Sequence, residues 1–226
     1  MPTLSRESIE KIAHAELNKI DVKCLLEAGV ISVSEIETYV KEQLGLTIEL
    51  LPQGSDLLGA CSISNKIIWI HPSIKDSNRY LFILAHEIGH YLLHTDVVID
   101  QDTYEYFSDP EVNFITKKST FDNPKQWIEW QANCFASEFV LPKAVLYSRL
   151  VRLQRYLKLK EGIVYLDDQP ENRANFYELI TLLSKLFHVS KTSVIYKLKE
   201  MNLLKDNSRL QSIGQIIAEY FPDLLV

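Results

Sequence analysis

The chain opens with apolar side chains that recur three and four positions apart, with charged residues between them. This period over residues 5–28 predicts a first amphipathic helix. A second helix is expected to begin after Ser32 or Ser34, because either hydroxyl can cap the first turn. It should run to about Leu44, since Gly45 follows and glycine commonly ends a helix.

The pattern then changes from the period of a helix to that of strands. Short runs rich in β-branched and apolar residues predict strands at residues 46–51, 57–63 and 66–70. Turn-forming residues separate these runs, and such short polar turns are typical of hairpins. We therefore expect a small three-stranded antiparallel sheet.

A nearly continuous apolar segment follows at residues 80–94 and predicts a helix buried on most sides. Its interior polar residues are His86, Glu87 and His90. Burying them without partners would cost roughly 2–7 kcal/mol for each neutral group, and a metal ion would remove that cost. The two histidines are four positions apart and project from one face, and Glu87 beside them can take a proton from water. This is the His-Glu-x-x-His signature of zinc metallopeptidases; the alternative is a pair of core histidines with ordinary hydrogen bonds.

A catalytic zinc ion takes three protein ligands, so one more ligand must come from elsewhere in the chain. The longer motif with a third histidine fails, because Leu93 replaces its glycine and Asp96 replaces that histidine. His94 lies one helical turn beyond His90, about 6 Å along the axis. We interpret it as a residue that supports a ligand or contacts substrate, with a plain polar helix end as the alternative.

A second helical segment, residues 123–142, offers better ligands. Asn123 can cap this helix, and Pro124 suits its first turn. Glu129 and Asn133 are four positions apart at the margin of the apolar face, so Glu129 can bind the metal while Asn133 hydrogen-bonds a ligand histidine. Glu138 is the rival ligand, but it does not share the face of Glu129. A solvated carboxylate is the other interpretation of Glu129.

Two segments of the chain together resemble the ImmA/IrrE metallopeptidases, which are bacterial and phage-associated regulators. They are Leu84-Ala-His-Glu-Ile-Gly-His-Tyr-Leu-Leu-His94 and Glu129-Trp-Gln-Ala-Asn-Cys-Phe-Ala-Ser-Glu-Phe-Val-Leu-Pro142, and the resemblance covers roughly residues 30–145. The chain departs from the usual pattern in a longer spacer between the two helices and in bulky Trp130 and Cys134. These departures concern the choice of substrate more than the chemistry.

The resemblance implies a gluzincin-like zinc site in which His86, His90 and Glu129 bind the metal and Glu87 is catalytic. It implies a zinc-dependent endopeptidase whose protein substrate is a helix-turn-helix transcriptional repressor. Cleavage would derepress genes of a phage, a mobile element or a stress response. Manganese is the alternative metal, because two histidines and a glutamate accept either ion.

The C-terminal third of the chain is expected to be helical. A helix should run from Pro142 to about Lys160, and residues 167–172 suggest a linker. Residues 177–204 have helix-turn-helix character, with Ser190 capping a second helix that carries three lysines. We favour packing or partner recognition over DNA binding for this segment. The alternative function for the whole chain is a regulator that binds a partner or DNA and has little peptidase activity.

The spacer between the two motif helices, residues 95–122, is acidic and aromatic and is interpreted as a lid or a surface insertion. Tyr104 or Tyr106 within it could donate a hydrogen bond to the oxyanion of the reaction. The expected regions of the chain are N-terminal helices, a metallopeptidase core and a helical C-terminal region, at residues 1–45, 46–145 and 146–226. The fold class is therefore α+β, mainly helical, with the small antiparallel sheet beside the His-Glu-x-x-His helix.

The composition of the chain argues against some classes of protein but does not indicate a function. The 226 residues are 46% hydrophobic and 24% charged, and the net charge of −6 gives no general attraction to nucleic acid or anionic membranes. No apolar run reaches the roughly 18 residues that span a bilayer, and the first residues lack the pattern of a signal peptide. Three cysteines at unrelated spacings are typical of reduced thiols. We expect a cytoplasmic protein with no membrane association.

Overall fold

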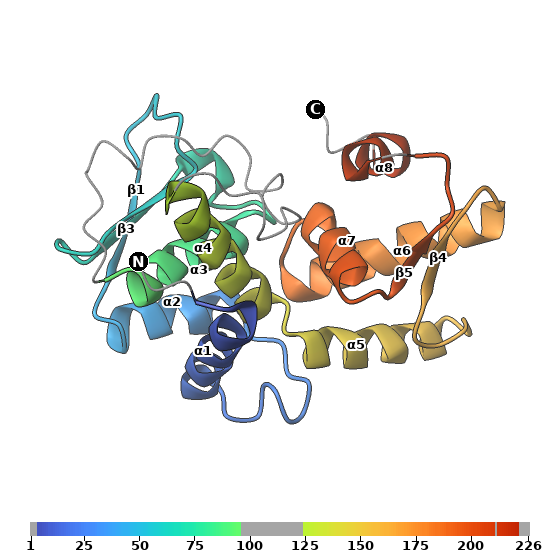
Figure 1. Ribbon diagram of the computed structural model, residues 1–226, viewed down its shortest axis with the longest axis horizontal. Helices are drawn as coiled ribbons and strands as arrows, with labels where there is room; N and C mark the ends of the chain where they lie inside the picture. Colours follow the sequence, from blue (N-terminus) through green and yellow to red (C-terminus); the bar gives the residue numbers. More distant parts are fainter. Residues whose placement is uncertain (1–3, 96–123, 211, 222–226) are drawn as a thin grey trace.

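The computed structural model describes residues 4–95, 124–210 and 212–221 (Figure 1). Within these ranges the chain is mainly helical, as expected. The α-helices are α1 (Arg6–Ile20), α2 (Val33–Glu42), α3 (Tyr80–Leu93), α4 (Pro124–Val140), α5 (Lys143–Tyr156), α6 (Pro170–Phe187), α7 (Lys191–Glu200) and α8 (Ile213–Tyr220). The strands are β1 (Thr47–Leu50), β2 (Gly59–Ser62), β3 (Ile67–Ile70), β4 (Val164–Leu166) and β5 (Leu204–Asp206).

The predicted strands β1, β2 and β3 form one sheet in the order β1-β3-β2, but the expected antiparallel arrangement is only half right. β2 pairs antiparallel with β3, and Gly59 lies opposite Ile70. β1 runs parallel to β3, and Thr47 lies opposite Ile67, so the sheet is mixed. β1 and β2 are neighbours in sequence but lie at opposite edges of the sheet, with β3 between them. The most apolar strand then takes the centre, where Ile68 is fully buried.

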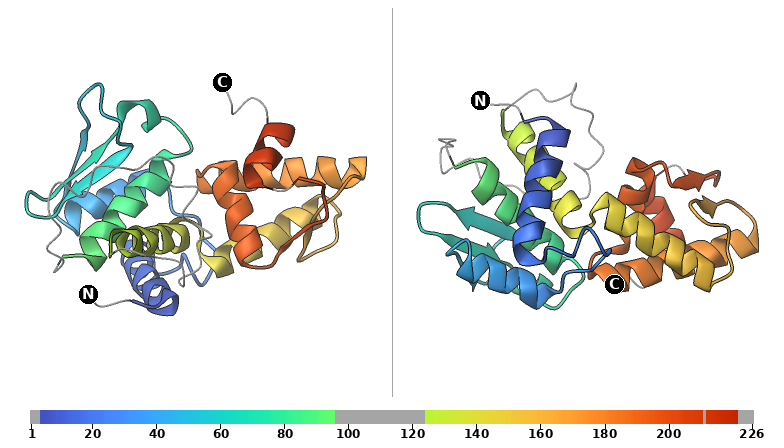
Figure 2. Two further views of the ribbon diagram at one scale, coloured as in Figure 1. Left: turned by 45° about the horizontal axis from the view of Figure 1, so that its top comes forward. Right: turned by 90° about the horizontal axis from the view of Figure 1, so that it is seen from below.

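Helix α3 lies between this sheet and α4 (Figures 1 and 2). Every residue from Tyr80 to His90 is buried, which confirms the prediction of a helix covered on most sides. Helix α1 packs against α4, so α4 is covered in turn. The motif helix is therefore fixed by the sheet on one side and by a second helix on the other.

The N-terminal helices follow the predicted boundaries only in part. Ser32 caps α2 and forms a capping box with Glu35, as its position in the sequence suggested. Gly45 adopts a positive φ just after α2, a conformation that glycine enters without steric cost. α1 ends at Ile20 rather than at residue 28, because the carboxylate of Asp21 accepts a backbone N–H two residues on and starts a turn.

The C-terminal region contains elements that the sequence pattern did not predict. β4 and β5 pair in parallel and have three residues each, too few for a period to emerge. The predicted linker at residues 167–172 begins directly after β4. Its second half is helical, because α6 begins at Pro170. α5 is shorter than expected and ends at Tyr156, since Lys158 takes a left-handed conformation. α8 was also not predicted.

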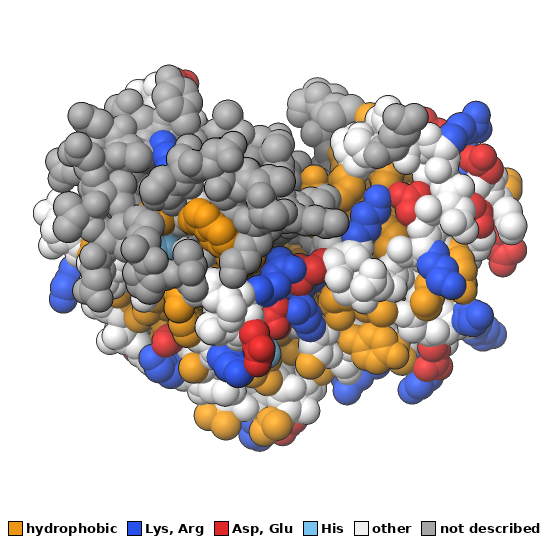
Figure 3. All heavy atoms as spheres, viewed as in Figure 1, with side chains coloured by type: hydrophobic (Ala, Val, Ile, Leu, Met, Phe, Trp, Pro, Cys, Tyr) orange, Lys and Arg blue, Asp and Glu red, His pale blue; other side chains and the backbone are white. Residues whose placement is uncertain are grey.

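The predicted turn between α6 and α7 has the expected boundaries. α6 ends at Phe187, His188 adopts a left-handed conformation, and the hydroxyl of Ser190 accepts the backbone N–H of Ser193 at the start of α7. None of the residues of α7 is exposed. On the face drawn in Figure 3, the described lysines and arginines are interspersed with acidic side chains.

The lysines of α7 make contacts inside the protein. Lys197 is 2% exposed, and its Nζ lies 2.7 Å from Oε2 of Glu138 on α4. The Nζ of Lys199 lies 2.8 Å from a carboxylate oxygen of Asp206. The Nζ of Lys191 lies 4.2 Å from the centre of the Phe221 ring. These contacts hold α7 against α4, which carries Glu129, and against β5 and the residue that follows α8.

No helix within the described ranges combines the length and the apolar character needed to cross a membrane.

We predict that Lys197→Met lowers the free energy of unfolding by about 3–5 kcal/mol, because it leaves Glu138 buried without its cation. Urea unfolding followed by circular dichroism measures this loss. Lys199→Met is the matched control on the same helix, since its side chain is partly exposed and its ion pair should contribute less than about 1 kcal/mol. Equal losses in the two variants would contradict the role assigned to the buried pair.

Candidate metal centre

The structure brings together the three residues expected to bind a metal. α3 presents His86 and His90 on one face, and their Nε2 atoms lie 2.9 Å apart. Oε2 of Glu129 on α4 lies 3.3 Å from each of these nitrogens. All three side chains are buried, and their ligand atoms form a cluster that could hold one ion.

The geometry and the chemistry of this cluster fit a divalent cation. A zinc ion bound tetrahedrally at about 2.0–2.2 Å would hold neighbouring ligand atoms about 3.3–3.6 Å apart. Two of the three separations in the structure are 3.3 Å and the third is 2.9 Å. Oε2 of Glu129 is buried, and it makes no well-directed hydrogen bond within the described part of the chain although it lies 3.3 Å from each imidazole. Burial opposes its ionisation, but His90 and His86 lower the pKa of Glu129 to about 2. Glu129 thus offers an ionised oxygen whose polar partners are the two imidazoles, as a candidate metal ligand should.

A close contact between α3 and α4 places the ligands opposite one another. A Cβ atom on Gly89 would lie 3.2 Å from the Cα of Ala132 and 3.3 Å from its carbonyl oxygen. The absence of a side chain at Gly89 therefore lets the backbone of α4 approach α3. Glu129 lies three residues before Ala132, so this contact sets its distance from the two histidines.

Glu87, the expected catalytic residue, is 4% exposed and lies on the side of α3 that meets β2. A Cβ atom on Gly59 would lie 2.7 Å from Oε1 of Glu87 and 2.6 Å from Cγ2 of Ile83. The carboxylate therefore lies against the backbone of the edge strand. Burial raises the pKa of Glu87, which suits a group that must accept and release a proton. Sequence reasoning missed Gly59, although a glycine inside a predicted strand is a known sign of close approach.

Each ligand histidine is supported by a hydrogen bond through its other nitrogen. Nδ1 of His86 lies 2.9 Å from Oδ1 of Asn133, the contact that the spacing of Glu129 and Asn133 suggested. Nδ1 of His90 lies 3.1 Å from Nδ1 of His94, which is 2% exposed. His94 thus ends α3 but is not a solvated helix end. Its pKa is lowered to about 3 by burial, with His90 adding to the effect.

Glu138, the rival ligand, belongs to a different cluster. Its Oε2 pairs with Lys197, and its Oε1 lies 2.8 Å from Nε2 of His14 and accepts the backbone N–H of Lys143. Its carboxylate is fully engaged there, so it is not free to bind an ion beside the histidines. Tyr104 and Tyr106, the two suggested oxyanion donors, lie outside the described residues.

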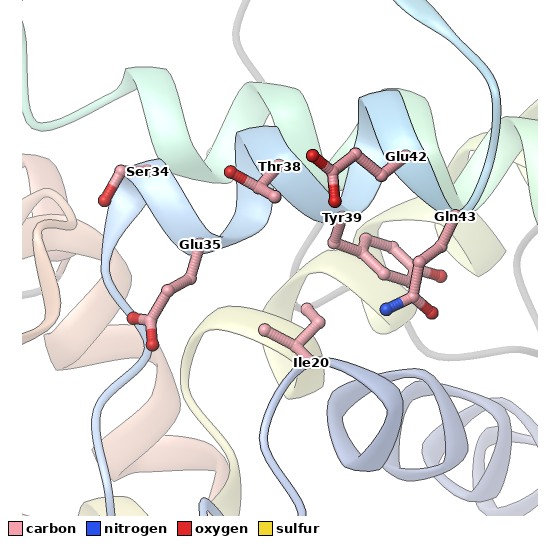
Figure 4. Close-up of a pocket in the computed structure, with 7 residues that line it drawn as sticks. All are labelled: Ile20, Ser34, Glu35, Thr38, Tyr39, Glu42 and Gln43. Carbon is pink, nitrogen blue, oxygen red and sulfur yellow. The ribbon is translucent and has the colours of Figure 1, made fainter.

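A surface hollow between α1 and α2 is separate from the metal centre (Figure 4). Its lining side chains come from the end of α1 and from α2 and the residue after it. They are Ile20, Ser34, Glu35, Thr38, Tyr39, Glu42 and Gln43. None belongs to the ligand cluster, and Glu35 is already engaged in the capping box of α2.

We predict that Gly89→Val forces α3 and α4 apart. The added carbons would meet the backbone of Ala132, so the free energy of unfolding should fall by about 1–3 kcal/mol and the protein should lose bound metal. Gly214→Val is the matched control, because Gly214 is an exposed helical glycine and a Cβ atom added there would lie no closer than 3.8 Å to its surroundings. Undiminished metal content in Gly89→Val would contradict the role of this contact.

Comparison with known proteins agrees with the centre described above. The family model of the peptidase family M78, described as an IrrE N-terminal-like domain, matches residues 41–199. This span contains α3, α4 and the whole candidate ligand set, and it continues through α5 and α6 into α7. No curated protein matches the sequence significantly. The match covers more than half of the chain and confirms the resemblance to the ImmA/IrrE metallopeptidases: the chain belongs to the peptidase family M78.

Proposed function

We propose that the chain is a zinc-dependent endopeptidase. The observation that carries this proposal is the convergence of His86, His90 and Glu129 on one point, with Glu87 buried on the same helix as the histidines. Such a set leaves room for a reactant as a fourth ligand, which distinguishes a catalytic zinc site from a structural one. When bound, the ion would polarise the scissile carbonyl and bring the pKa of water to about 7.

In this proposal Glu87 is the general base and then the general acid. It accepts the proton of the attacking water and later delivers that proton to the leaving amine. A carboxylate exposed to solvent has a pKa of about 4.3 and is a weaker base than one whose pKa is raised toward the working pH. The burial of Glu87 and its raised pKa support the assignment.

Strand β2 is the proposed binding edge for the substrate. It pairs with β3 on one side, and no other described strand pairs with it, so a substrate strand is proposed to add at its other edge. Gly59 on this strand contacts the side chain of Glu87. A peptide that extends the sheet along β2 would therefore pass beside the catalytic carboxylate.

The proposed substrate is a helix-turn-helix transcriptional repressor, cleaved to derepress genes of a phage, a mobile element or a stress response. Its support is membership of the family, together with the implications of the ImmA/IrrE resemblance. Zinc is proposed over manganese because two histidines with one carboxylate suit a tetrahedral zinc ion. For the alternative of a DNA-binding regulator, α7 offers no exposed residue with which to read bases.

We predict that Glu87→Gln retains the metal but lowers the cleavage rate by at least about 10²-fold, because the amide cannot accept the proton. The test labels the new protein N-termini in bacterial cells that produce either the wild type or the variant. A small set of new termini should appear with the wild type alone.

Metal content of the two purified proteins serves as the control, because both should carry the ion. Identical sets of new termini in the two cultures would contradict the proposed peptidase. So would the absence of new termini from both cultures when the cells contain candidate repressors.

A further inference from the structure

The two ligand histidines are supported in chemically different ways. Asn133 approaches His86 with an amide oxygen, which can only accept a hydrogen bond. His94 approaches His90 with a ring nitrogen, which can either donate or accept. The contact with Asn133 therefore requires a proton on Nδ1 of His86. The contact with His94 can form with the shared proton on Nδ1 of either His90 or His94.

Metal binding selects between these two arrangements. Nε2 of His90 faces the ligand cluster, so it must offer a lone pair to the ion. The proton of the neutral His90 ring must then lie on Nδ1 and be donated to His94. Nδ1 of His94 consequently accepts, and the proton of the neutral His94 ring lies on its Nε2.

The far side of His94 shows where this chain of hydrogen bonds ends. Nε2 of His94 is buried and has no hydrogen-bond partner among the described residues. Nδ2 of Asn133, the residue that supports His86, is likewise buried without a hydrogen-bond partner among the described residues. His86 with Asn133, and His90 with His94, thus form two similar chains. Each chain begins at a candidate ligand nitrogen, passes through one hydrogen bond and ends at a buried N–H group.

We propose that His94 is a positioning residue that holds His90 in the Nδ1–H tautomer by accepting its hydrogen bond through Nδ1. His94 does not bind the metal and does not touch substrate in this assignment. It acts through His90, whose Nε2 then offers its lone pair to the ion. The inference rests on the proposed function, because it presumes that the cluster of His86, His90 and Glu129 binds zinc.

Two substitutions of similar size separate the hydrogen bond from simple packing. His94→Asn keeps an acceptor atom near the place of Nδ1, whereas His94→Leu removes it. The zinc dissociation constant is measured by competition with a chromogenic chelator, and circular dichroism confirms folding. His94→Leu should weaken zinc binding by about 10–100-fold, and His94→Asn by less than about tenfold.

His71→Leu is the matched control, because His71 hydrogen-bonds Ser73 at the end of β3 and belongs to no ligand cluster among the described residues. It should bind zinc as the wild type does. Wild-type binding by both His94 variants, or equal weakening in both, would overturn the inference while leaving the peptidase proposal intact. A wild type that binds no zinc would instead overturn the proposed function, and the inference with it.

Long-range proton–nitrogen spectra of the zinc-loaded wild type, labelled at histidine nitrogens, test the tautomers directly. The inference requires protonated Nδ1 on His90 and protonated Nε2 on His94. A proton on Nδ1 of His94 would overturn it even if the affinities changed as expected.

Discussion

The structure depends on the pairing of α3 with α4, which buries the imidazoles of His86 and His90 and the carboxylate of Glu129 in an apolar interface. Gly89 and Ala132 bring the helix backbones together, and the same approach brings Glu129 to the two histidines. Ionisable groups buried in this way need partners, and within the described part of the chain Oε2 of Glu129 has only the two imidazoles, each 3.3 Å away. A cation would satisfy this oxygen and both nitrogens together, so the contact that packs the two helices also forms the candidate metal site.

Much of this centre could be predicted from sequence because its signals are local. His86 and His90 share a helix, so their spacing alone places them on one face. Glu129 and Asn133 stand in the same relation on α4, and the structure brings both to the histidines as expected. The caps at Ser32 and Ser190 are local as well, since each hydroxyl accepts an N–H three residues on.

The remaining features depend on contacts between distant segments, which spacing does not reveal. The parallel course of β1 depends on which strand takes the centre of the sheet, and the importance of Gly59 depends on the helix that packs beneath β2. The lysines on α7 suggested a basic face, but Lys197 is buried against Glu138, some sixty positions earlier. That pair explains why one glutamate of α4 faces the metal cluster while another anchors the C-terminal region.

The most direct test is the metal content of the purified chain, measured for the wild type and for Glu129→Ala. Glu49→Ala, which removes an exposed carboxylate on β1, is the control. The account predicts about one zinc per chain in the wild type and in the control, and little in Glu129→Ala, because two histidines alone make an incomplete site. Full metal content in Glu129→Ala, or no metal in the wild type, would contradict it.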